Sequence, residues 1–502
     1  MSETFDVIIV GGGGSGLATA VSAVENGLSV LVLEKEAHLG GTTGIAVGSI
    51  SANGTSIQKK AGITDNPDDQ DEDIGKFSPA GLEERNNAEL RRFFTEHNGE
   101  TLEWLQSMGL VFHGPNPEPP NRVNRMHNVV PNARAYIITL QTRFMKLGGT
   151  IKLNARVTEL QRDGSRISGV VISGEAGKQS FNAKRGVVLA GGDFSSSPEM
   201  IAKYKGEEYA SIEGINPHAN GDGQNLAIEA GAKMVNMDVT YGPEFRFIPQ
   251  EGKTFIQLIP VSGPIAWLMG KVMPLIPDKM INAYIKRLLV SWQHPEDALF
   301  ADGAILINQN GERFCNENES PEREIKLGKQ PQKISYVLMD KRLTDKYSEW
   351  PHFISTAPQI AYAYTKDYLS IRPDIACAGK SLDAVCDTRK IPVDTLRKTI
   401  ADYNSYVAGE NKDAFGRNGD TNPIQEGEMV LLGPAKAYFT MTEGGALVNT
   451  SLAVLDEDET PIPGLFAVGQ NGLGGQIIWG HGLHIGWAMT SGRVLGKLLA
   501  KA

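Results

Sequence analysis

The first 34 residues of this 502-residue chain constrain its fold more than any other stretch. Residues 7–10 are apolar and β-branched, which is typical of a strand buried on both faces of a parallel sheet. A glycine-rich turn over residues 11–16 opens a helical pattern, and a second apolar run over residues 28–33 ends at Glu34. This order predicts a strand–helix–strand unit that binds a dinucleotide.

Three glycines of the turn are expected to act differently. Gly11 permits the tight turn, Gly13 lets a pyrophosphate approach the backbone, and Gly16 lets the helix pack closely on the strand. The pyrophosphate is expected at the free N–H groups and positive end of that helix. Glu34 is expected to accept hydrogen bonds from a ribose, and its charge disfavours a 2′-phosphate. A turn without a ligand is the alternative, but the complete order of elements favours a nucleotide.

Composition limits the class of protein. A chain of this length is expected to form two or three structural units. The net charge of −10 leaves no basic surface for a nucleic acid. The three cysteines are irregularly spaced and no metal-ligand spacing is present, so we expect neither a disulfide framework nor a metal site. The first strand begins within a few residues of the N-terminus, which leaves no room for a signal segment, and we expect a cytoplasmic protein.

Beyond Glu34 the chain resembles a known flavoprotein family. Lys35, the stretch Gly40-Gly41-Thr42-Thr43 and residues 58–63 resemble the flavoproteins of fumarate reductase and succinate dehydrogenase, which include 3-ketosteroid dehydrogenases and urocanate reductase. The resemblance covers nearly the whole chain and implies FAD as the cofactor. Membrane-bound members carry a histidine in this stretch that is joined covalently to FAD. Thr42 stands at the matching position, so the resemblance implies non-covalent FAD.

The resemblance implies an α/β fold in which a Rossmann-like FAD-binding domain carries an inserted α+β capping domain. We expect the FAD-binding domain over residues 1–236 and 442–502, and the capping domain, which closes over substrate, over residues 237–441. Residues 255–292 are unusually apolar, but prolines divide them into pieces too short to span a bilayer. They could form buried core, a lid over an apolar pocket or a membrane-contacting surface, and we favour core and lid.

The expected cofactor contacts come from glycine-rich turns and strand ends. Residues 186–192 form a buried strand that ends in glycines and resembles the family's second approach to the dinucleotide. Asp222 belongs to an element that the family places beside the flavin, although it could instead cap the helix that follows. The expected FAD-binding residues are Gly11, Gly13, Gly14, Ser15, Gly16, Glu34, Lys35, Gly41, Thr42, Thr43, Gly48, Ser49, Val157, Ala190, Gly191, Gly192, Asp222, Gly469, Gln470, Gly482, Leu483 and Ile485.

The resemblance also implies a proton donor. By residue order, Arg313 matches the arginine that delivers a proton in soluble fumarate reductases. A guanidinium holds its proton tightly, so such a role requires a relay that re-protonates it. An ion pair between Arg313 and Glu312, Glu317 or Glu319 is the structural alternative.

Other candidate acids and bases come from the residues themselves. His481 and His484 lie in a glycine-rich loop, where either could donate to a substrate carbonyl, contact the flavin or merely satisfy backbone groups. Tyr241 and Tyr364 are further catalytic candidates, and His127 is a candidate pocket residue.

The chain departs from the fumarate reductases where those enzymes hold substrate carboxylates. They carry a histidine before a Gly-Gly pair and an arginine in the last glycine-rich loop. Here residues 440–443 read Thr-Met-Thr-Glu, and the arginine position falls near Trp479. Losing charge-assisted contacts costs on the order of 2 kcal/mol for each contact. We therefore expect an apolar cyclic ketone rather than a dicarboxylate. The tyrosine of ketosteroid dehydrogenases would fall near Ile478, which argues against steroid 1,2-dehydrogenation.

The sequence thus predicts an FAD-dependent oxidoreductase that exchanges hydride between flavin N5 and the carbon β to a carbonyl, as C=C reduction or desaturation. Three alternatives stay open: a carboxylate substrate bound through Arg122, Arg125 or Arg246, a non-catalytic FAD-binding protein, and a membrane-associated quinone-linked subunit. No second Gly-x-Gly-x-x-Gly unit is evident, so the electron donor or acceptor is unknown.

Overall fold

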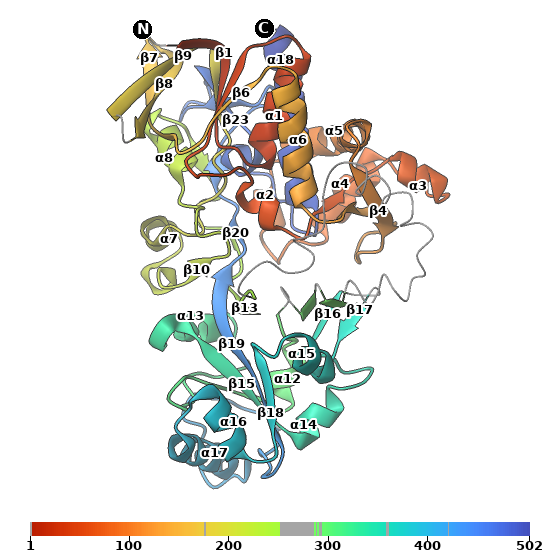
Figure 1. Cartoon of the computed structure of the whole chain (residues 1–502), viewed down its shortest axis with the longest axis vertical. Helices are drawn as coiled ribbons and strands as arrows, with labels where there is room; N and C mark the ends of the chain where they lie inside the picture. Colours follow the sequence, from red (N-terminus) through yellow and green to blue (C-terminus); the bar gives the residue numbers. More distant parts are fainter. Residues whose placement is uncertain are drawn as a thin grey trace.

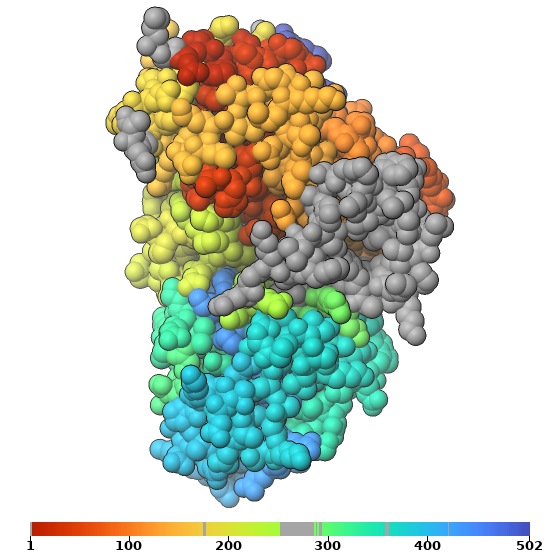
Figure 2. Space-filling view, viewed as in Figure 1, coloured from red at the N-terminus to blue at the C-terminus, as the bar shows by residue number. Residues whose placement is uncertain are grey.

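The computed structural model describes residues 3–174, 177–250, 286–287, 289–290, 294–357, 361–419 and 421–501. Figure 1 shows two units, with both ends of the chain in the upper one. In the face drawn in Figure 2, the middle of the chain forms the lower unit. The apolar stretch 255–292 lies mainly outside the described residues, so its expected role as core or lid stays a prediction.

The upper unit is built on a largely parallel sheet in the order β22-β23-β9-β1-β2-β6, with a meander of β7 and β8 continuing from β9. Strand β1 pairs in parallel with β2 on one side and β9 on the other, and its residues 7–10 are buried. The strands are β1 (Glu3–Val10), β2 (Val30–Leu33), β6 (Thr150–Lys152), β7 (Arg156–Asp163), β8 (Arg166–Gly174), β9 (Gly177–Leu189), β22 (Ala453–Leu455) and β23 (Pro461–Ala467).

Helices cover this sheet (Figure 1), and the predicted strand–turn–helix–strand unit is present, with β1 and β2 paired in parallel and α1 between them in the chain. Helix α1 packs closely against α18 because Gly492 faces it, and a Cβ on Gly492 would lie 2.5 Å from the Ser15 carbonyl oxygen. The helices are α1 (Gly14–Glu25), α2 (Gly41–Ile45), α3 (Ser56–Lys60), α4 (Pro67–Gly75), α5 (Ala88–Ser107), α6 (Arg134–Lys146), α8 (Asp222–Glu229) and α18 (Leu483–Lys501). A small sheet beside them contains β3 (Ser49–Ser51), β4 (Val111–Asn116) and β5 (Met126–Val130).

The lower unit is organised around β19, the long strand that pairs with β10, β13, β15 and β18. Its strands are β10 (Glu213–Gly214), β13 (Glu244–Phe247), β14 (Ile305–Ile307), β15 (Ser335–Asp340), β16 (Ser355–Ala357), β17 (Ala361–Ala363), β18 (Ala376–Gly379) and β19 (Met429–Phe439). Its helices are α7 (Pro198–Tyr204), α12 (Ala298–Ala301), α13 (Glu322–Gly328), α14 (Lys341–Lys346), α15 (Thr365–Ile371), α16 (Leu382–Arg389) and α17 (Val393–Val407).

Two short antiparallel pairs lie where the chain passes between the units. Strand β12 (Thr240–Tyr241) pairs with β20 (Met441–Thr442), and β11 (Met234–Val235) pairs with β21 (Gly445–Ala446). The units have separate hydrophobic cores, and Phe194, Met200 and Ile212 belong to the core of the lower unit. The predicted α/β class is therefore confirmed.

No helix in the described part of the chain is both long enough and apolar enough to cross a membrane.

Candidate functional site

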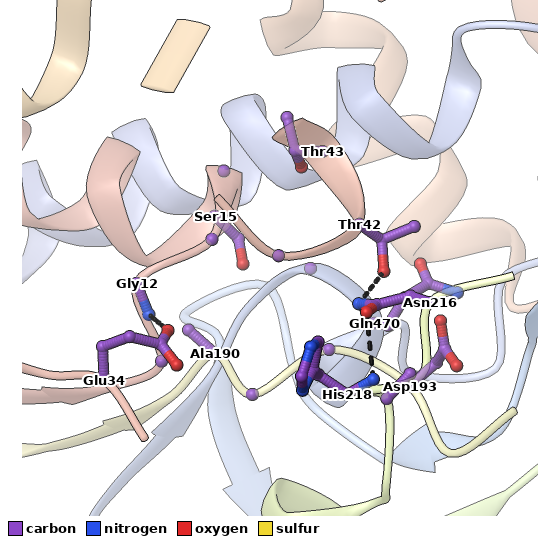
Figure 3. A pocket seen from close by; sticks show the side chains of 18 of the residues that line it. Gly12, Ser15, Glu34, Thr42, Thr43, Ala190, Asp193, Asn216, His218 and Gln470 are labelled. Atoms are coloured by element: carbon purple, nitrogen blue, oxygen red, sulfur yellow. Dashed lines mark hydrogen bonds between the residues drawn. The ribbon is translucent and has the colours of Figure 1, made fainter. Parts of the chain in front are cut away.

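A cavity of about 230 Å³ lies at the carboxyl ends of β1, β2 and β9. It is lined by segments far apart in the chain, from the first glycine-rich turn to the start of α18 (Figure 3). The expected cofactor residues that line it are Gly11, Gly13, Gly14, Ser15, Glu34, Lys35, Gly41, Thr42, Thr43, Val157, Ala190, Gly191, Gly192, Asp222, Gly469, Gln470 and Ile485. The remaining expected residues, Gly16, Gly48, Ser49, Gly482 and Leu483, do not line it.

The glycine-rich turn has the geometry of a phosphate cradle. A Cβ on Gly16 would lie 2.0 Å from the Gly11 carbonyl oxygen, so this glycine allows the helix to pack on the strand. A Cβ on Gly13 would meet no atom closer than 3.8 Å, so the space beside this residue is open. Gly13 is also the N-cap of α1, and no side chain caps the first turn. The backbone N–H groups there are available to an anion.

Glu34 is held at the end of β2 in position for a ribose. One carboxylate oxygen accepts a hydrogen bond from the Gly12 amide at 2.8 Å, and the other accepts from the Glu36 amide at 2.9 Å (Figure 3). The side chain lines the cavity although only 8 % of Glu34 is exposed. The glycine cradle and this carboxylate therefore fit the dinucleotide part of FAD.

Asp222 does not cap its helix. Gly221 is the N-cap of α8, and the Asp222 carboxylate instead forms ion pairs with Lys35 at 2.7 Å and Arg156 at 2.5 Å. Burial raises the pKa of Asp222. The hydrogen bond from Lys35 and the charges of Lys35 and Arg156 lower this pKa by more, so the net shift is downward. Asp222 thus remains an anion that holds two cationic side chains at the wall of the cavity.

Thr42 faces the cavity with its hydroxyl oxygen, which accepts a hydrogen bond from the Asn216 side-chain amide at 2.9 Å (Figure 3). A threonine at this position offers no imidazole nitrogen for a covalent bond to the flavin. Asn216 also lines the cavity and was not anticipated from the sequence.

Among the five candidate acids and bases, His484 is the one that the structure places in the wall of the cavity. It lies in the first turn of α18, and its Nε2 is 2.8 Å from the Glu443 Oε1. The Glu443 side chain is fully buried, whereas 12 % of the His484 side chain is exposed. Asp193, another cavity residue, is buried close by, and this burial raises its pKa to about 6.

Tyr241 and His481 lie outside the residues that line the cavity. The Tyr241 ring packs against Trp479 with centroids 4.9 Å apart, and burial raises the pKa of its hydroxyl to about 12. The hydroxyl is therefore protonated at neutral pH. The His481 side chain is 65 % exposed, and its Nδ1 lies 2.7 Å from Glu118 Oε1. The hydrogen bond that the His481 ring donates to the Glu118 carboxylate raises the pKa of His481.

The structure places Arg313 inside the lower unit. Its guanidinium is 6 % exposed and pairs with Glu317 at 2.8 Å and Asp413 at 2.5 Å. The rings of Tyr403 and Phe415 lie on it at 5.0 and 5.4 Å from their centroids. This arrangement is the ion pair with Glu317 that the sequence offered as the structural alternative.

Tyr364 also lies away from the cavity. It is the N-cap of α15, and its amide donates to Asp367 at 2.9 Å. The ammonium of Lys286 lies 5.2 Å from the centre of its ring. These contacts give Tyr364 a place in the packing of the lower unit.

The side chains considered for a carboxylate substrate have protein partners. Arg122 and Arg125 both pair with the buried Asp73, and Arg246 pairs with Glu244 at 2.5 Å. Neither these arginines nor His127, which is fully buried, line the cavity. Burial lowers the pKa of His127 to about 4, so the ring is neutral at pH 7.

Two acidic residues of the site were missed. Glu443 appeared in the sequence only as a place where the family's histidine is absent, and Asp193, which directly follows the glycine-ended strand over residues 186–192, was not among the candidates. The contact between Glu443 and His484 forms only in the folded chain, because His484 lies 41 residues beyond Glu443. No spacing rule in the sequence could have found this contact.

The fold and the cavity define a dinucleotide-binding α/β protein. The chain matches the family described as FAD binding domain over residues 6–258 and 288–476, which is most of its length. It therefore belongs to this family, that of the fumarate reductase flavoproteins, and is an FAD-dependent oxidoreductase.

The chain is similar to named members of this family. It is 27 % identical over 491 residues to a probable fumarate reductase of Shewanella frigidimarina, covering 95 % of this chain and 73 % of that one. It is 24 % identical to the vinyl phenol reductase of Lactiplantibacillus plantarum, covering 99 % and 97 % of the two chains.

Two solved structures have the same fold as this chain. An open conformation of a flavocytochrome c3 fumarate reductase superposes with a TM-score of 0.73 at 25 % identity, covering all of this chain and 78 % of that one. The 3-ketosteroid Δ1-dehydrogenase of Sterolibacterium denitrificans shares the fold, with a TM-score of 0.64 at 18 % identity over the whole of both chains.

Proposed function

We propose that this oxidoreductase acts on a carbon–carbon bond next to a carbonyl group, either reducing C=C or forming it, and that its substrate is an apolar cyclic ketone. The observation that carries the proposal is the position of His484, a proton-transferring side chain in the wall of the cofactor cavity. The similar proteins named as fumarate reductase and vinyl phenol reductase support the C=C chemistry.

The two halves of the reaction have different sources. Bound FAD supplies hydride exchange with the β-carbon. The chain supplies the proton: in the reductive direction, His484 gives a proton to the α-carbon as the electron pair of the C=C bond forms the new C–H bond. In the oxidative direction, the same nitrogen takes that proton. Either direction leaves charge and atoms balanced.

The contacts of the described cationic groups favour an uncharged substrate. Arg246 is the arginine nearest to the Tyr241–Trp479 pair in sequence, and its guanidinium is already paired with Glu244. Trp479 stands where the resemblance places a carboxylate-binding arginine, so an aromatic ring replaces an anion-binding group. A ring-shaped apolar substrate fits such a surface better than a dicarboxylate does.

We also propose that FAD is held without a covalent bond, since Thr42 presents a hydroxyl to the cavity. The cytoplasmic location stays a prediction from the sequence.

The test is an anaerobic titration of the reduced holoenzyme, followed at the flavin absorbance near 450 nm. Cyclic enones are expected to reoxidise the flavin, whereas fumarate and urocanate are not. Rapid reoxidation by the unsaturated acids would support a carboxylate substrate instead. The non-catalytic alternative would be supported by two results together: reduced holoenzyme that no unsaturated compound reoxidises, and oxidised holoenzyme that no saturated ketone reduces.

A further inference from the structure

Glu443 and His484 form a pair that joins two distant parts of the chain at the cavity wall. Glu443 lies between β20 and β21, at the crossing between the units, and His484 lies in the first turn of α18. The Nε2 of the imidazole is 2.8 Å from Oε1 of the carboxylate. In the described part of the chain, His484 is the one side chain that bonds to this carboxylate.

The burial of Glu443 makes this contact more than a surface ion pair. The carboxylate is fully buried, and its second oxygen, Oε2, has no hydrogen-bond partner among the described residues. A buried carboxylate is stabilised as an anion by a hydrogen-bond donor or a positive charge beside it, and the His484 ring is the group placed to provide it. The positive end of α18 opposes a cation at His484, and the Glu443 charge offsets that effect.

We propose that Glu443 is the positioning residue for His484: it fixes the ring with Nε2–H directed at Oε1, so that Nδ1 is the atom that exchanges a proton with the substrate. This inference rests on the proposed function. In the reductive direction the Nδ1–H bond breaks and the α-carbon gains the proton. The ring remains as the neutral tautomer that carries its proton on Nε2, still bonded to Glu443.

Two other titratable groups act on this pair. Asp193 lies just after β9 and interacts electrostatically with both His484 and Glu443. Tyr241 in β12 interacts with Glu443 in the same way, and its hydroxyl is protonated over the useful pH range. Asp193 is therefore the group whose own titration has to be separated from that of the pair.

The chain contains a matched control for the proposed pair. His481 and Glu118 have the same type of contact, with Nδ1 and Oε1 at 2.7 Å, but His481 is exposed and does not line the cavity. Glu118→Gln therefore removes the carboxylate bound to His481, a histidine of the same glycine-rich loop, without touching the proposed proton donor.

The first experiment needs no substrate. In ¹⁵N-histidine-labelled holoenzyme, the His484 signals are assigned by their loss in His484→Gln. At high pH we expect the Nε2-protonated tautomer in the wild type, and His484 nitrogen signals that are shifted in Glu443→Gln. The same signals should be unchanged in Glu118→Gln. An Nδ1-protonated ring, or His484 signals that are identical in wild type and Glu443→Gln, would overturn the proposal.

The second experiment measures turnover with a cyclic enone found in the titration above. Glu443→Gln is expected to lower kcat by ~100-fold, a size typical of general acid–base catalysis, with KM changed less than threefold and the limb at higher pH moved to lower pH. Asp193→Asn measures how much of that limb belongs to Asp193, and Glu118→Gln should retain the wild-type profile. If Glu443→Gln fails to bind FAD, the tautomer of His484 in wild-type protein still decides the question.

The two experiments separate two kinds of failure. Absence of turnover with every ketone, together with an Nε2-protonated ring held by Glu443, would overturn the proposed function and leave the pair intact. Turnover with a wild-type pH profile in Glu443→Gln would overturn the positioning role and leave the function intact.

Discussion

Two glycines of the first turn lack a side chain for different physical reasons. At Gly16 the chain itself leaves no space, because a Cβ would overlap the Gly11 carbonyl oxygen. At Gly13 the chain leaves space, and its backbone angles, φ −82° and ψ −168°, are accessible to alanine. The fold therefore does not require glycine at position 13. A bound ligand that needs this space does.

The variants Gly13→Ala and Gly16→Ala are therefore expected to behave differently. Gly13→Ala should keep the apo protein's unfolding temperature but bind FAD roughly tenfold or more weakly, since the methyl group enters the space of the pyrophosphate. Gly16→Ala should lower the free energy of unfolding of the apo protein by about 1–3 kcal/mol. Thermal unfolding and FAD fluorescence titration measure the two effects. Equal FAD affinity in Gly13→Ala and wild type would place the pyrophosphate elsewhere.

Residues whose role depends on near neighbours in the chain could be predicted. The glycines and Glu34 act within one strand–turn–helix–strand unit, so their spacing determines where they meet. Arg313 was selected by residue order alone. Its first partner, Glu317, is four residues along the chain, but its second partner, Asp413, is a hundred residues further along. Resemblance could not decide between a proton donor and an ion pair, because the partner Asp413 carries no motif.

At the scale of elements, buried ion pairs hold loops against the two sheets. Arg313, Glu317, Asp413 and Arg417 form one such group in the lower unit, and it joins the segment after β14 to the loop after α17. Removing one partner from a buried pair leaves an uncompensated charge. The group therefore stabilises the lower unit, whatever the chemistry in the cavity.

Arg313→Met tests this interpretation against the catalytic one. We expect the free energy of unfolding to fall by about 3–5 kcal/mol, because Asp413 loses its ion-pair partner and Glu317 keeps only Arg417. The rate of flavin reoxidation by an enone, expressed per bound FAD, should stay within twofold of the wild type. A large loss of that rate at unchanged stability would make Arg313 the proton donor, as the resemblance implied.

A second group of ion pairs lies at α4, where the buried Asp73 pairs with Arg122, Arg125 and Lys76. Burial raises the pKa of Asp73, but hydrogen bonds from these three cations lower it more, to well below its usual range. A carboxyl with a lowered pKa in the folded state stabilises the protein above its unfolded pKa of about 3.9, and this contribution is lost as the pH falls.

Stability should accordingly fall as the pH is lowered from 5 towards 2. Asp73→Asn is expected to lose about 2–3 kcal/mol at pH 7 and to show a shallower fall below pH 5. Urea unfolding at a series of pH values gives both quantities. The control is Asp68→Asn, which removes an exposed partner of Arg92 and should cost less than about 1 kcal/mol. Parallel pH curves for wild type and Asp73→Asn would contradict the assignment.

At the scale of the whole molecule, the two cores need not respond equally to the cofactor. The cavity is lined mainly by residues of the upper unit, whereas β19 and its neighbours form a separate core. The sequence predicted the α/β class because periodicity and glycine spacing are local properties. It could not predict that the segment around Phe194, Met200 and Ile212 packs in the lower core, because an apolar pattern does not identify its partner.

Binding of FAD should therefore protect one unit more than the other. At a free FAD concentration of 100 Kd, the upper unit is expected to gain about 2.7 kcal/mol of stability. Hydrogen exchange should slow most in residues 7–16 and 483–501. It should slow least in α17, which lies at the end of the lower unit that is remote from the upper unit (Figure 1). Uniform slowing across both units would show that they unfold together.

The close packing of α18 on α1 also has a consequence for biosynthesis. During translation the glycine-rich turn emerges first, yet its opposite wall, with Gly469, His484 and Ile485, emerges only after the whole lower unit. A chain on the ribosome thus has an incomplete binding site for the vitamin-derived coenzyme until α18 emerges. Yellow colour should appear only after α18 has emerged from the ribosome, and nascent chains stalled before Leu483 should stay colourless.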